Sequence, residues 1–216
     1  MSFKLYYAPG ACSFVPHSLL ELSGAAFEPI SVKLHKGEQH SADYLTLNPR
    51  GQVPVLVDGS DVITQIVAIV LHLDTRLPQA QLLPQSGLAR SRAIETFAWL
   101  NNTVHPAFTH VFMPQKFTDD AAAQAAVKAF GQAKYRELML ELEAMVARKN
   151  TEWFTGAQPG VLDAYATTVM RWSGFAGIDP TTLTATWALA QAYTALPAVA
   201  RAVEREKLQL NVYKPA

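Results

Sequence analysis

Apolar and polar residues change their spacing along the chain, and up to about residue 77 the spacing switches between that of strands and that of helices. The segment "FKLYY" is short and aromatic, which favours a strand. From Val15 onward apolar residues recur at helical spacing until Gly24, a natural helix stop. "PISVKLH" then alternates strictly, which predicts a second strand with Ile30, Val32 and Leu34 on one face. A strand, a helix and a strand in succession favour a parallel pair.

The next segment predicts a hairpin followed by a helix. "VPVLVDGSDVITQ" holds two apolar runs around an Asp58-Gly59 turn, as expected for paired antiparallel strands. The residues after it form one apolar stripe at helical spacing, and Pro78 lies just beyond the stripe: Ile66, Ile69, Val70, Leu73 and Leu77. These elements predict a small mixed sheet with helices packed on it.

After "PQAQLLPQSG" the spacing is helical nearly to the end of the chain. "RAIETFAWLNNTVHPAF" predicts an amphipathic helix that Pro106 should kink. Further helices are expected over residues 119–148, over "VLDAYATTVMRW", and over residues 187–193 and 197–208. We therefore predict an α/β domain over residues 1–78, a linker over 79–88 and an all-helical domain over 89–216.

Composition narrows the classes of protein that this chain can belong to. It has 216 residues, of which 50% are hydrophobic, so it can bury a large core. Its 18 Lys plus Arg balance 18 Asp plus Glu with no basic stripe, which argues against a nucleic-acid or anionic-membrane partner. No apolar run is long enough for a membrane span, and the first residues lack the layout of a signal peptide. A single cysteine excludes an internal disulfide and fits a cytoplasmic setting.

The single cysteine, Cys12, follows a Pro-Gly turn where the first strand meets the first helix. With Ser13 as the N-cap, Pro16 falls at the third helical position, where its missing N–H costs little. Cys12 would then face free backbone N–H groups and the positive end of the helix dipole, which lower the pKa of a thiol. We therefore expect a reactive thiolate. The alternative is a buried and inert cysteine, the commoner fate of lone cysteines.

A second feature is "NPRGQVPVLV", in which Pro54 precedes a strand and cannot donate to a sheet ladder. Together with "YYAPGACSFVPH", "TQIVAIVLHL" and "PGVLDAYATTVMRW", in this order and spacing, it resembles the cytosolic glutathione transferases, and the bacterial beta class most closely. The resemblance covers the whole chain. It implies a thioredoxin-like N-terminal domain, with a cis Val53–Pro54 peptide bond, followed by an all-helical C-terminal domain.

The resemblance also implies a glutathione site in the N-terminal domain. Cys12 matches the cysteine that lies beside the glutathione sulfur and can form a mixed disulfide with it. Tyr7 matches an aromatic residue of the same site, although a tyrosine here could equally fill the sheet edge. The backbone of Val53 should pair with the cysteinyl part of glutathione. Gln65 and Ile66, at the start of a helix, match the residues that hold the γ-glutamyl carboxylate.

Three further residues are candidates for the same site. His105 matches a histidine that approaches the thiol from the helical domain in the beta class. Lys36 could contact the glycyl carboxylate, although a lysine in such a loop is more often simply solvated. His17 lies one helical turn beyond Cys12, where it could tune the thiol or be a buried imidazole with its own partners.

Three positions depart from the family pattern. Ile66 stands where the family usually has serine, threonine or glycine, which predicts weakened glutathione binding unless Ile66 is a core residue of its apolar stripe. Pro106 stands where the beta class usually has lysine. Gly160 replaces the serine or threonine that caps the central helix three residues before Asp163, and at an N-cap this change costs only a few tenths of a kcal/mol.

The resemblance implies a homodimeric detoxification enzyme with glutathione as co-substrate, a hydrophobic second substrate and no permanently bound cofactor. Two chemistries are open: conjugation of glutathione to electrophiles, and thiol exchange or peroxide reduction through Cys12. The lone cysteine favours the second. The alternative is a non-catalytic protein of the same fold that binds another ligand or a protein partner.

Other chemistries find little support in the sequence. The histidine pairs His35/His40 and His105/His110 are spaced by five residues, which suits no familiar metal site, and no second cysteine is available. Generic apolar side chains such as Phe108, Phe112 and Trp172 do not identify the second substrate.

Overall fold

The computed structural model describes residues 3–215, and its N-terminal half is built on a sheet with the strand order β2-β1-β3-β4. The strands are β1 (Phe3–Tyr7), β2 (Phe27–Ser31), β3 (Val55–Asp58) and β4 (Asp61–Thr64). β1 and β2 are parallel, as the strand–helix–strand pattern predicted, and β3 and β4 form the predicted hairpin. β1 pairs with β3 in antiparallel orientation, which makes the sheet mixed.

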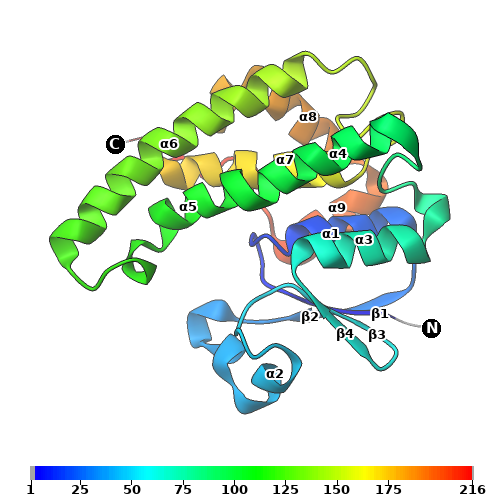
Figure 1. Ribbon diagram of the computed structural model, residues 1–216, viewed down its shortest axis with the longest axis horizontal. Helices are drawn as coiled ribbons and strands as arrows, with labels where there is room; N and C mark the ends of the chain where they lie inside the picture. Colours follow the sequence, from blue (N-terminus) through cyan, green and yellow to red (C-terminus); the bar gives the residue numbers. More distant parts are fainter. Residues whose placement is uncertain (1–2, 216) are drawn as a thin grey trace.

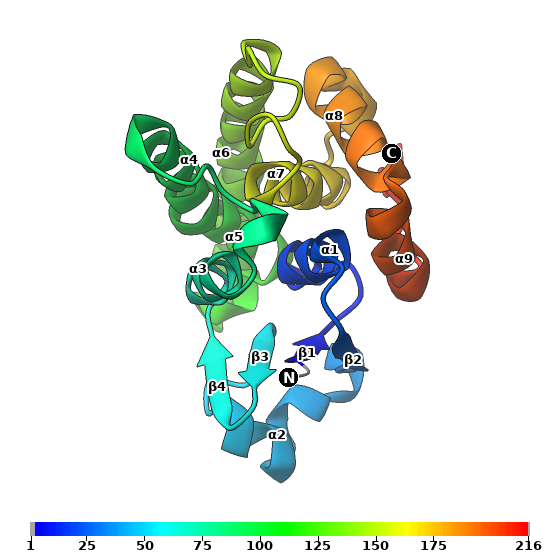
Figure 2. The same ribbon diagram turned by 90° about the vertical axis from the view of Figure 1, so that its right-hand side faces the viewer.

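Three helices accompany this sheet. They are α1 (Phe14–Ser23), α2 (Ala42–Leu47) and α3 (Ile66–Arg76). α1 and α3 lie between the sheet and the helical half of the molecule, whereas α2 lies on the opposite side of the sheet (Figures 1 and 2). Gly24 ends α1 in the left-handed conformation with φ 70°, so the predicted helix stop is confirmed.

The second strand begins and ends earlier than the alternating pattern predicted. Its ladder with β1 runs from Phe27, opposite Phe3, to Ser31, opposite Tyr7. Because β1 ends at Tyr7, later residues have no strand to pair with. Leu34 therefore lies in a 3₁₀ turn (Leu34–Lys36), followed by a second turn (Glu38–His40) that leads into α2.

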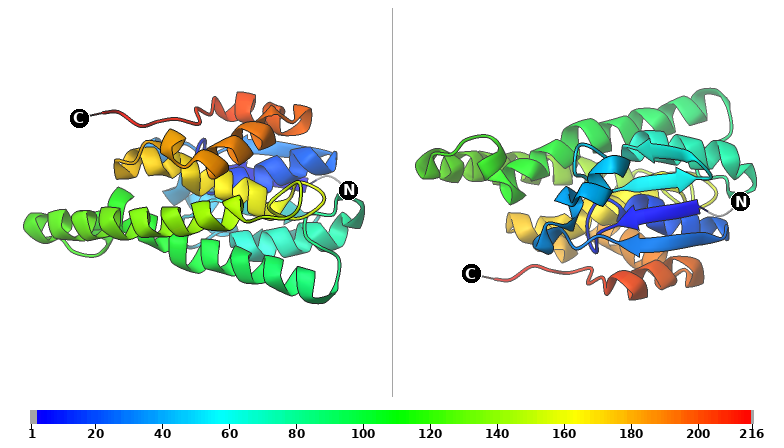
Figure 3. Two further views of the ribbon diagram at one scale, coloured as in Figure 1. Left: turned by 90° about the horizontal axis from the view of Figure 1, so that it is seen from above. Right: turned by 90° about the horizontal axis from the view of Figure 1, so that it is seen from below.

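The C-terminal half is helical, as predicted. Its helices are α4 (Gly87–Trp99), α5 (His105–Phe112), α6 (Ala121–Ala147), α7 (Val161–Trp172), α8 (Thr184–Ala195) and α9 (Pro197–Glu206). α7 lies at the centre, with every residue from 161 to 170 buried, so it is buried all round rather than along one stripe. α9 packs beside α1, and α6 extends well beyond its neighbours (Figures 2 and 3).

The predicted kink near Pro106 takes the form of a π-helical turn. This turn, Leu100–Val104, connects α4 directly to α5, and Pro106 occupies the first turn of α5. Proline has no N–H to donate, and a widened turn just before it accommodates the missing bond. The turn places His105 at the start of a new helix.

One large apolar core joins the two halves of the molecule. Fully buried side chains of the sheet domain, such as Leu19 and Leu73, pack in the same cluster as Phe97 and Tyr165 of the helical half. A smaller cluster around Val32, Tyr44 and Val55 packs toward α2. Within the described residues, no helix is both long and apolar enough to cross a membrane.

Candidate functional site

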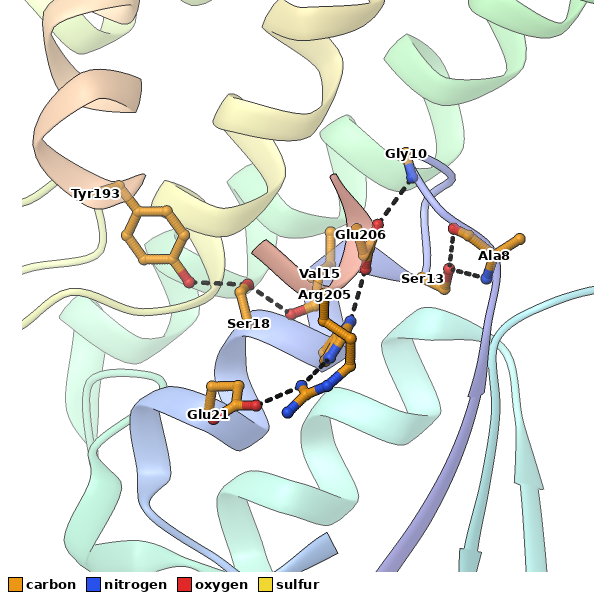
Figure 4. Close-up of polar contacts among 10 residues, drawn as sticks. Ala8, Gly10, Ser13, Val15, Ser18, Glu21, Tyr193, Arg205 and Glu206 are labelled. Atoms are coloured by element: carbon orange, nitrogen blue, oxygen red, sulfur yellow. Dashed lines mark hydrogen bonds and ion pairs between the residues drawn. The ribbon is translucent and has the colours of Figure 1, made fainter. Parts of the chain in front are cut away.

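Cys12 lies in a closed turn between β1 and α1. The Ser13 hydroxyl donates to the Ala8 carbonyl at 3.2 Å and accepts from the Ala8 N–H at 3.0 Å (Figure 4). The Ala11 N–H donates to the same carbonyl at 3.1 Å. Ser13 occupies the predicted N-cap position, but its hydroxyl closes this turn and makes no capping bond to α1. The turn thereby fixes Cys12 at the amino end of α1.

The structure brings Cys12 together with Val53. The thiol donates to the Val53 carbonyl with a sulfur–oxygen distance of 3.6 Å. The Val53–Pro54 peptide bond is cis, as the resemblance implied. The preceding Gln52 carbonyl accepts from the Tyr44 hydroxyl at 2.8 Å and from the Asn48 amide at 2.7 Å. These two bonds hold the loop that faces the thiol.

The expectation of a low thiol pKa is wrong for this arrangement. Burial raises the pKa of the Cys12 thiol to about 12. The backbone N–H groups of Cys12 and Ser13 lower this pKa, as the helix-terminus argument foresaw, but they do not outweigh the loss of water, and the Glu206 carboxylate raises it further. At neutral pH the site therefore holds a protonated thiol that acts as a hydrogen-bond donor.

Tyr7 is buried at the end of β1 and does not present a free phenol. Its ring contacts the His17 ring, with centroids 4.5 Å apart, and its hydroxyl bonds the side chain of Ser31 on the neighbouring strand. Burial raises the pKa of Tyr7, and the Glu206 carboxylate raises it further. These contacts favour the structural alternative, a tyrosine that fills the sheet edge.

Gln65 and Ile66 lie at the start of α3 in different environments. Gln65 is exposed and has φ 72°, a left-handed conformation that non-glycine residues adopt rarely and that clusters at ligand sites. The side chain of Ile66 is only 5% exposed and packs in the main core. The expected obstruction of a ligand by the bulk of Ile66 therefore has no structural support. Any contact of Ile66 with a ligand would therefore come from its backbone and not from its side chain.

His105 and the Cys12 turn both contact the same residue, Trp172. Its ring contacts the Trp172 ring, with centroids 4.9 Å apart, and the Trp172 indole N–H donates to the Gly10 carbonyl at 3.0 Å. Nδ1 of His105 lies 2.9 Å from the Tyr165 hydroxyl, which donates to Asn101 at 3.1 Å. Tyr165 thus accepts from Nδ1–H. Burial lowers the pKa of His105 to about 4, with a smaller contribution from Lys116.

Sequence reasoning missed the residues that hold Gly10, two positions before Cys12. Its N–H donates to the Glu206 carboxylate at 2.8 Å (Figure 4). Its carbonyl accepts from Trp172 and from Arg171 at 3.2 Å. Glu206 also lies 2.6 Å from Nδ1 of His17. His17 is therefore the buried imidazole with its own partners. No local signal marks contacts between residues more than 160 positions apart.

The two remaining positions, Lys36 and Pro106, make no polar contact with the site around Cys12 in the described residues. Lys36 is exposed at the end of a 3₁₀ turn, and no polar contact of the described residues joins it to Cys12 or Gln65. Pro106 is exposed at the start of α5. In residues 3–215, no three His, Cys, Asp or Glu side chains gather closely enough to hold a metal ion.

Comparison with known proteins gives consistent matches. Residues 1–75 match the model of the glutathione S-transferase N-terminal domain. The chain is 35% identical to the glutathione S-transferase GstA of Escherichia coli O157:H7 over 79% of its own length and 82% of that protein. Two solved structures match at 31% identity with TM-scores of 0.81, covering 95% of this chain and 100% of theirs. One is a sphingomonad glutathione S-transferase complexed with glutathione, and the other is the bacterial beta class enzyme of Sphingomonas chungbukensis.

Proposed function

The chain belongs to the glutathione S-transferase family, and we propose that it conjugates glutathione to hydrophobic electrophiles with the Cys12 thiol as a hydrogen-bond donor. It is a glutathione transferase-like enzyme that takes glutathione as a substrate rather than as a permanently bound cofactor. We also propose that it belongs to the beta class, which is supported by its own motifs and by its similarity to the Sphingomonas chungbukensis enzyme.

The observation that carries the proposal is the bond from Cys12 to the Val53 carbonyl. Glutathione that pairs with the Val53 backbone would compete for this carbonyl and free the S–H. The S–H would then donate to the glutathione sulfur and stabilise its thiolate. That thiolate attacks the electrophilic carbon, the new carbon–sulfur bond forms, and the leaving group departs with its bonding electrons. The proton that glutathione loses passes to solvent, because an imidazole with a pKa of about 4 is too weak a base to hold it at neutral pH.

The second substrate has an apolar surface beside this site. Phe108 stacks on Trp172 with ring centroids 4.7 Å apart, and Phe112 stacks on Phe108 at 5.5 Å. Phe112 remains 54% exposed. Because Trp172 bonds the Gly10 carbonyl, this row of rings leads away from the Cys12 turn. Phe108 and Trp172 are themselves buried, so we propose that hydrophobic electrophiles bind against the exposed Phe112 at the end of the row, which fits a detoxification role.

A second candidate is thiol exchange or peroxide reduction through Cys12, favoured by the partial exposure of this lone cysteine. In peroxide reduction the Cys12 sulfur takes one oxygen from ROOH, giving a sulfenic acid and ROH. Glutathione then forms the mixed disulfide with release of water, and a second glutathione restores the thiol and leaves as glutathione disulfide. The raised pKa of Cys12 disfavours this route, since the thiolate is the nucleophile.

Replacement of Cys12 separates the two chemistries. If the thiol is a donor, Cys12→Ser should retain conjugation with an aromatic electrophile, whereas Cys12→Ala should lower its kcat. If the thiol is the nucleophile, both variants should lose peroxide reduction, and intact-mass analysis after glutathione disulfide treatment should show a glutathionyl group on the wild type only. Conjugation at the wild-type rate by Cys12→Ala would contradict the donor role.

We also propose that the protein is a cytoplasmic homodimer with the domain boundaries that the sequence predicts. The lone cysteine fits a cytoplasmic setting, and two-fold dimers are the commonest oligomers. A monomeric mass by light scattering at micromolar concentration would contradict the dimer. Lys36 and Gln65 remain candidate ligands for the glutathione carboxylates, Gln65 on the ground of its unusual φ.

A further inference from the structure

A buried carboxylate on the last helix reaches the turn that carries Cys12. The side chain of Glu206, at the end of α9, is 0% exposed. One of its oxygens accepts the Gly10 N–H at 2.8 Å (Figure 4). The other lies 2.6 Å from Nδ1 of His17 on α1. A buried carboxylate is costly unless both oxygens have partners, and here both oxygens do.

The bond pattern around His17 makes a carboxylate the required group at position 206. The Arg205 guanidinium donates to Nε2 of His17 at 2.8 Å, and arginine has no acceptor. Nε2 therefore accepts, Nδ1 carries the proton, and Glu206 must accept from it. Glu206 must also accept from the Gly10 N–H. A glutamine of the same size has one acceptor oxygen and cannot serve both donors.

Gly10 itself has no freedom to leave this arrangement. Its carbonyl accepts from Trp172 and Arg171 on α7, so both of its backbone groups are held by the helical half. Its φ of 69° is left-handed, and a Cβ added there would lie 2.8 Å from Nη1 of Arg171. Since Ser13 closes the same turn on Ala8, the position of Gly10 determines the position of Cys12.

This carboxylate works against the acidity of the thiol that it holds in place. Charged and titratable groups on four sides interact with Glu206: Tyr7 on β1, Cys12 in the turn, His17 on α1 and Arg171 on α7. Arg205, the preceding residue on α9, bonds His17. The charge of Glu206 raises the pKa of Cys12. A need for an acidic thiol therefore does not explain why a carboxylate stands at position 206. Its geometry supplies the reason for its presence.

We propose that Glu206 is a positioning residue that fixes the Cys12 turn, so that the C-terminal helix and the thiol form one unit. This inference rests on the proposed role of Cys12 in the site. Alkylation of the folded protein by iodoacetamide tests it without glutathione, so it can fail or succeed independently of the transferase chemistry.

The test compares two substitutions between pH 7 and 9.5. Glu206→Gln keeps the size of the side chain and removes its charge. Glu206→Asp keeps the charge but has a side chain too short to contact both Gly10 and His17. If Glu206 positions the turn, both variants should expose the thiol and alkylate about three- to tenfold faster than the wild type at each pH, the upper value being the effect of one pKa unit. The exposed Glu204→Gln on the same helix is the matched control and should leave the rate unchanged.

Two outcomes would overturn the proposal. One is a wild-type alkylation rate in Glu206→Asp, which would mean that Glu206 acts through its charge alone. The other is a measurement of amide hydrogen exchange on the wild-type protein, so it can be made even where the variants fail to fold. The Gly10 amide should exchange with deuterium far more slowly than the amide of Gly59, which lies in an exposed turn. Equal exchange at the two glycines would show that α9 does not hold the turn.

Discussion

His105 begins α5 with its ring enclosed by Trp172 and its Nδ1–H bonded to Tyr165. Burial lowers its pKa to about 4, so the folded protein keeps the imidazole neutral at pH values where an unfolded chain would protonate it. With this pKa the imidazole is too weak a base to hold the proton of glutathione at physiological pH, although its Nε2 can accept a hydrogen bond. Because the folded state keeps His105 neutral, the free energy of unfolding falls in acid, where the unfolded state binds a proton that the folded state does not bind.

His105→Asn should therefore make stability less sensitive to acid. Asparagine keeps an N–H for Tyr165 but does not titrate. Between pH 7 and 5 the wild type should lose up to about 2 kcal/mol more unfolding free energy than the variant, since unfolded histidine titrates near pH 6.5. Urea unfolding at the two pH values measures the difference. Equal losses in the two proteins would mean that His105 titrates alike in the folded and unfolded states.

At this scale the sequence predicted which residues meet locally but not which distant side chains surround them. Cys12 and Val53 stand in short motifs, and the cis bond before Pro54 was foreseen only through the family that these motifs resemble. The thiol pKa was predicted with the wrong sign, because burial under a loop 41 residues away outweighs the helix terminus. Glu206 gave no signal at all, since its role depends on a contact across 196 positions.

The start of α7 shows how one element compensates for a departure from its family. Gly160 offers no hydroxyl at the N-cap, but the Thr155 hydroxyl accepts the Leu162 N–H at 2.9 Å from the preceding loop. Asp163 accepts the Gly160 N–H at 2.9 Å, as expected of a capping acid. A Cβ at Gly160 would lie 2.4 Å from the Leu82 carbonyl oxygen. Glycine is required there by close packing, and the cap is supplied from elsewhere.

Thr155→Val and Gly160→Ser should both destabilise the protein, although the second restores the family's usual cap residue. Thr155→Val leaves the buried Leu162 N–H without its partner, a loss of about 1–2 kcal/mol. Gly160→Ser pushes against Leu82, a cost of about 1–3 kcal/mol. Denaturant midpoints report both, with the exposed Thr103→Val as control. A more stable Gly160→Ser would show that the missing hydroxyl, and not the packing, governs this helix start.

Element type was predictable from spacing, whereas element ends depended on partners. The long helices appear where periodicity placed them, because burial of an apolar face decides them locally. β2 stops at Ser31 because β1 offers no further pairing, which its own alternating pattern cannot reveal. The π turn before Pro106 is likewise one of several ways to absorb a proline.

The two halves of the molecule are joined by charge as well as by their common core. Glu21 on α1 is 6% exposed and receives two arginines of α9: Arg201 at 2.6 Å and Arg205 at 2.5 Å. Burial by itself would raise the pKa of Glu21, but the bonds and charges of these arginines outweigh it, and the pKa is lowered. The sequence predicted both helices but not this contact between them.

Glu21→Gln should weaken the attachment of α9 to α1, by an amount that depends on pH. Above the unfolded pKa of glutamate, near 4.3, the paired carboxylate stabilises the folded state, and this contribution is lost as the pH falls through the lower folded pKa. At pH 7 we expect a loss of about 1–3 kcal/mol, limited because Arg201 and Arg205 are 52% and 35% exposed. Urea unfolding at pH 7, 5 and 3 should show the difference from the wild type shrinking in acid, while Glu204→Gln behaves as the wild type throughout. A difference that stays constant down to pH 3 would mean that the size and packing of Glu21, and not its charge, hold the last helix to the sheet domain.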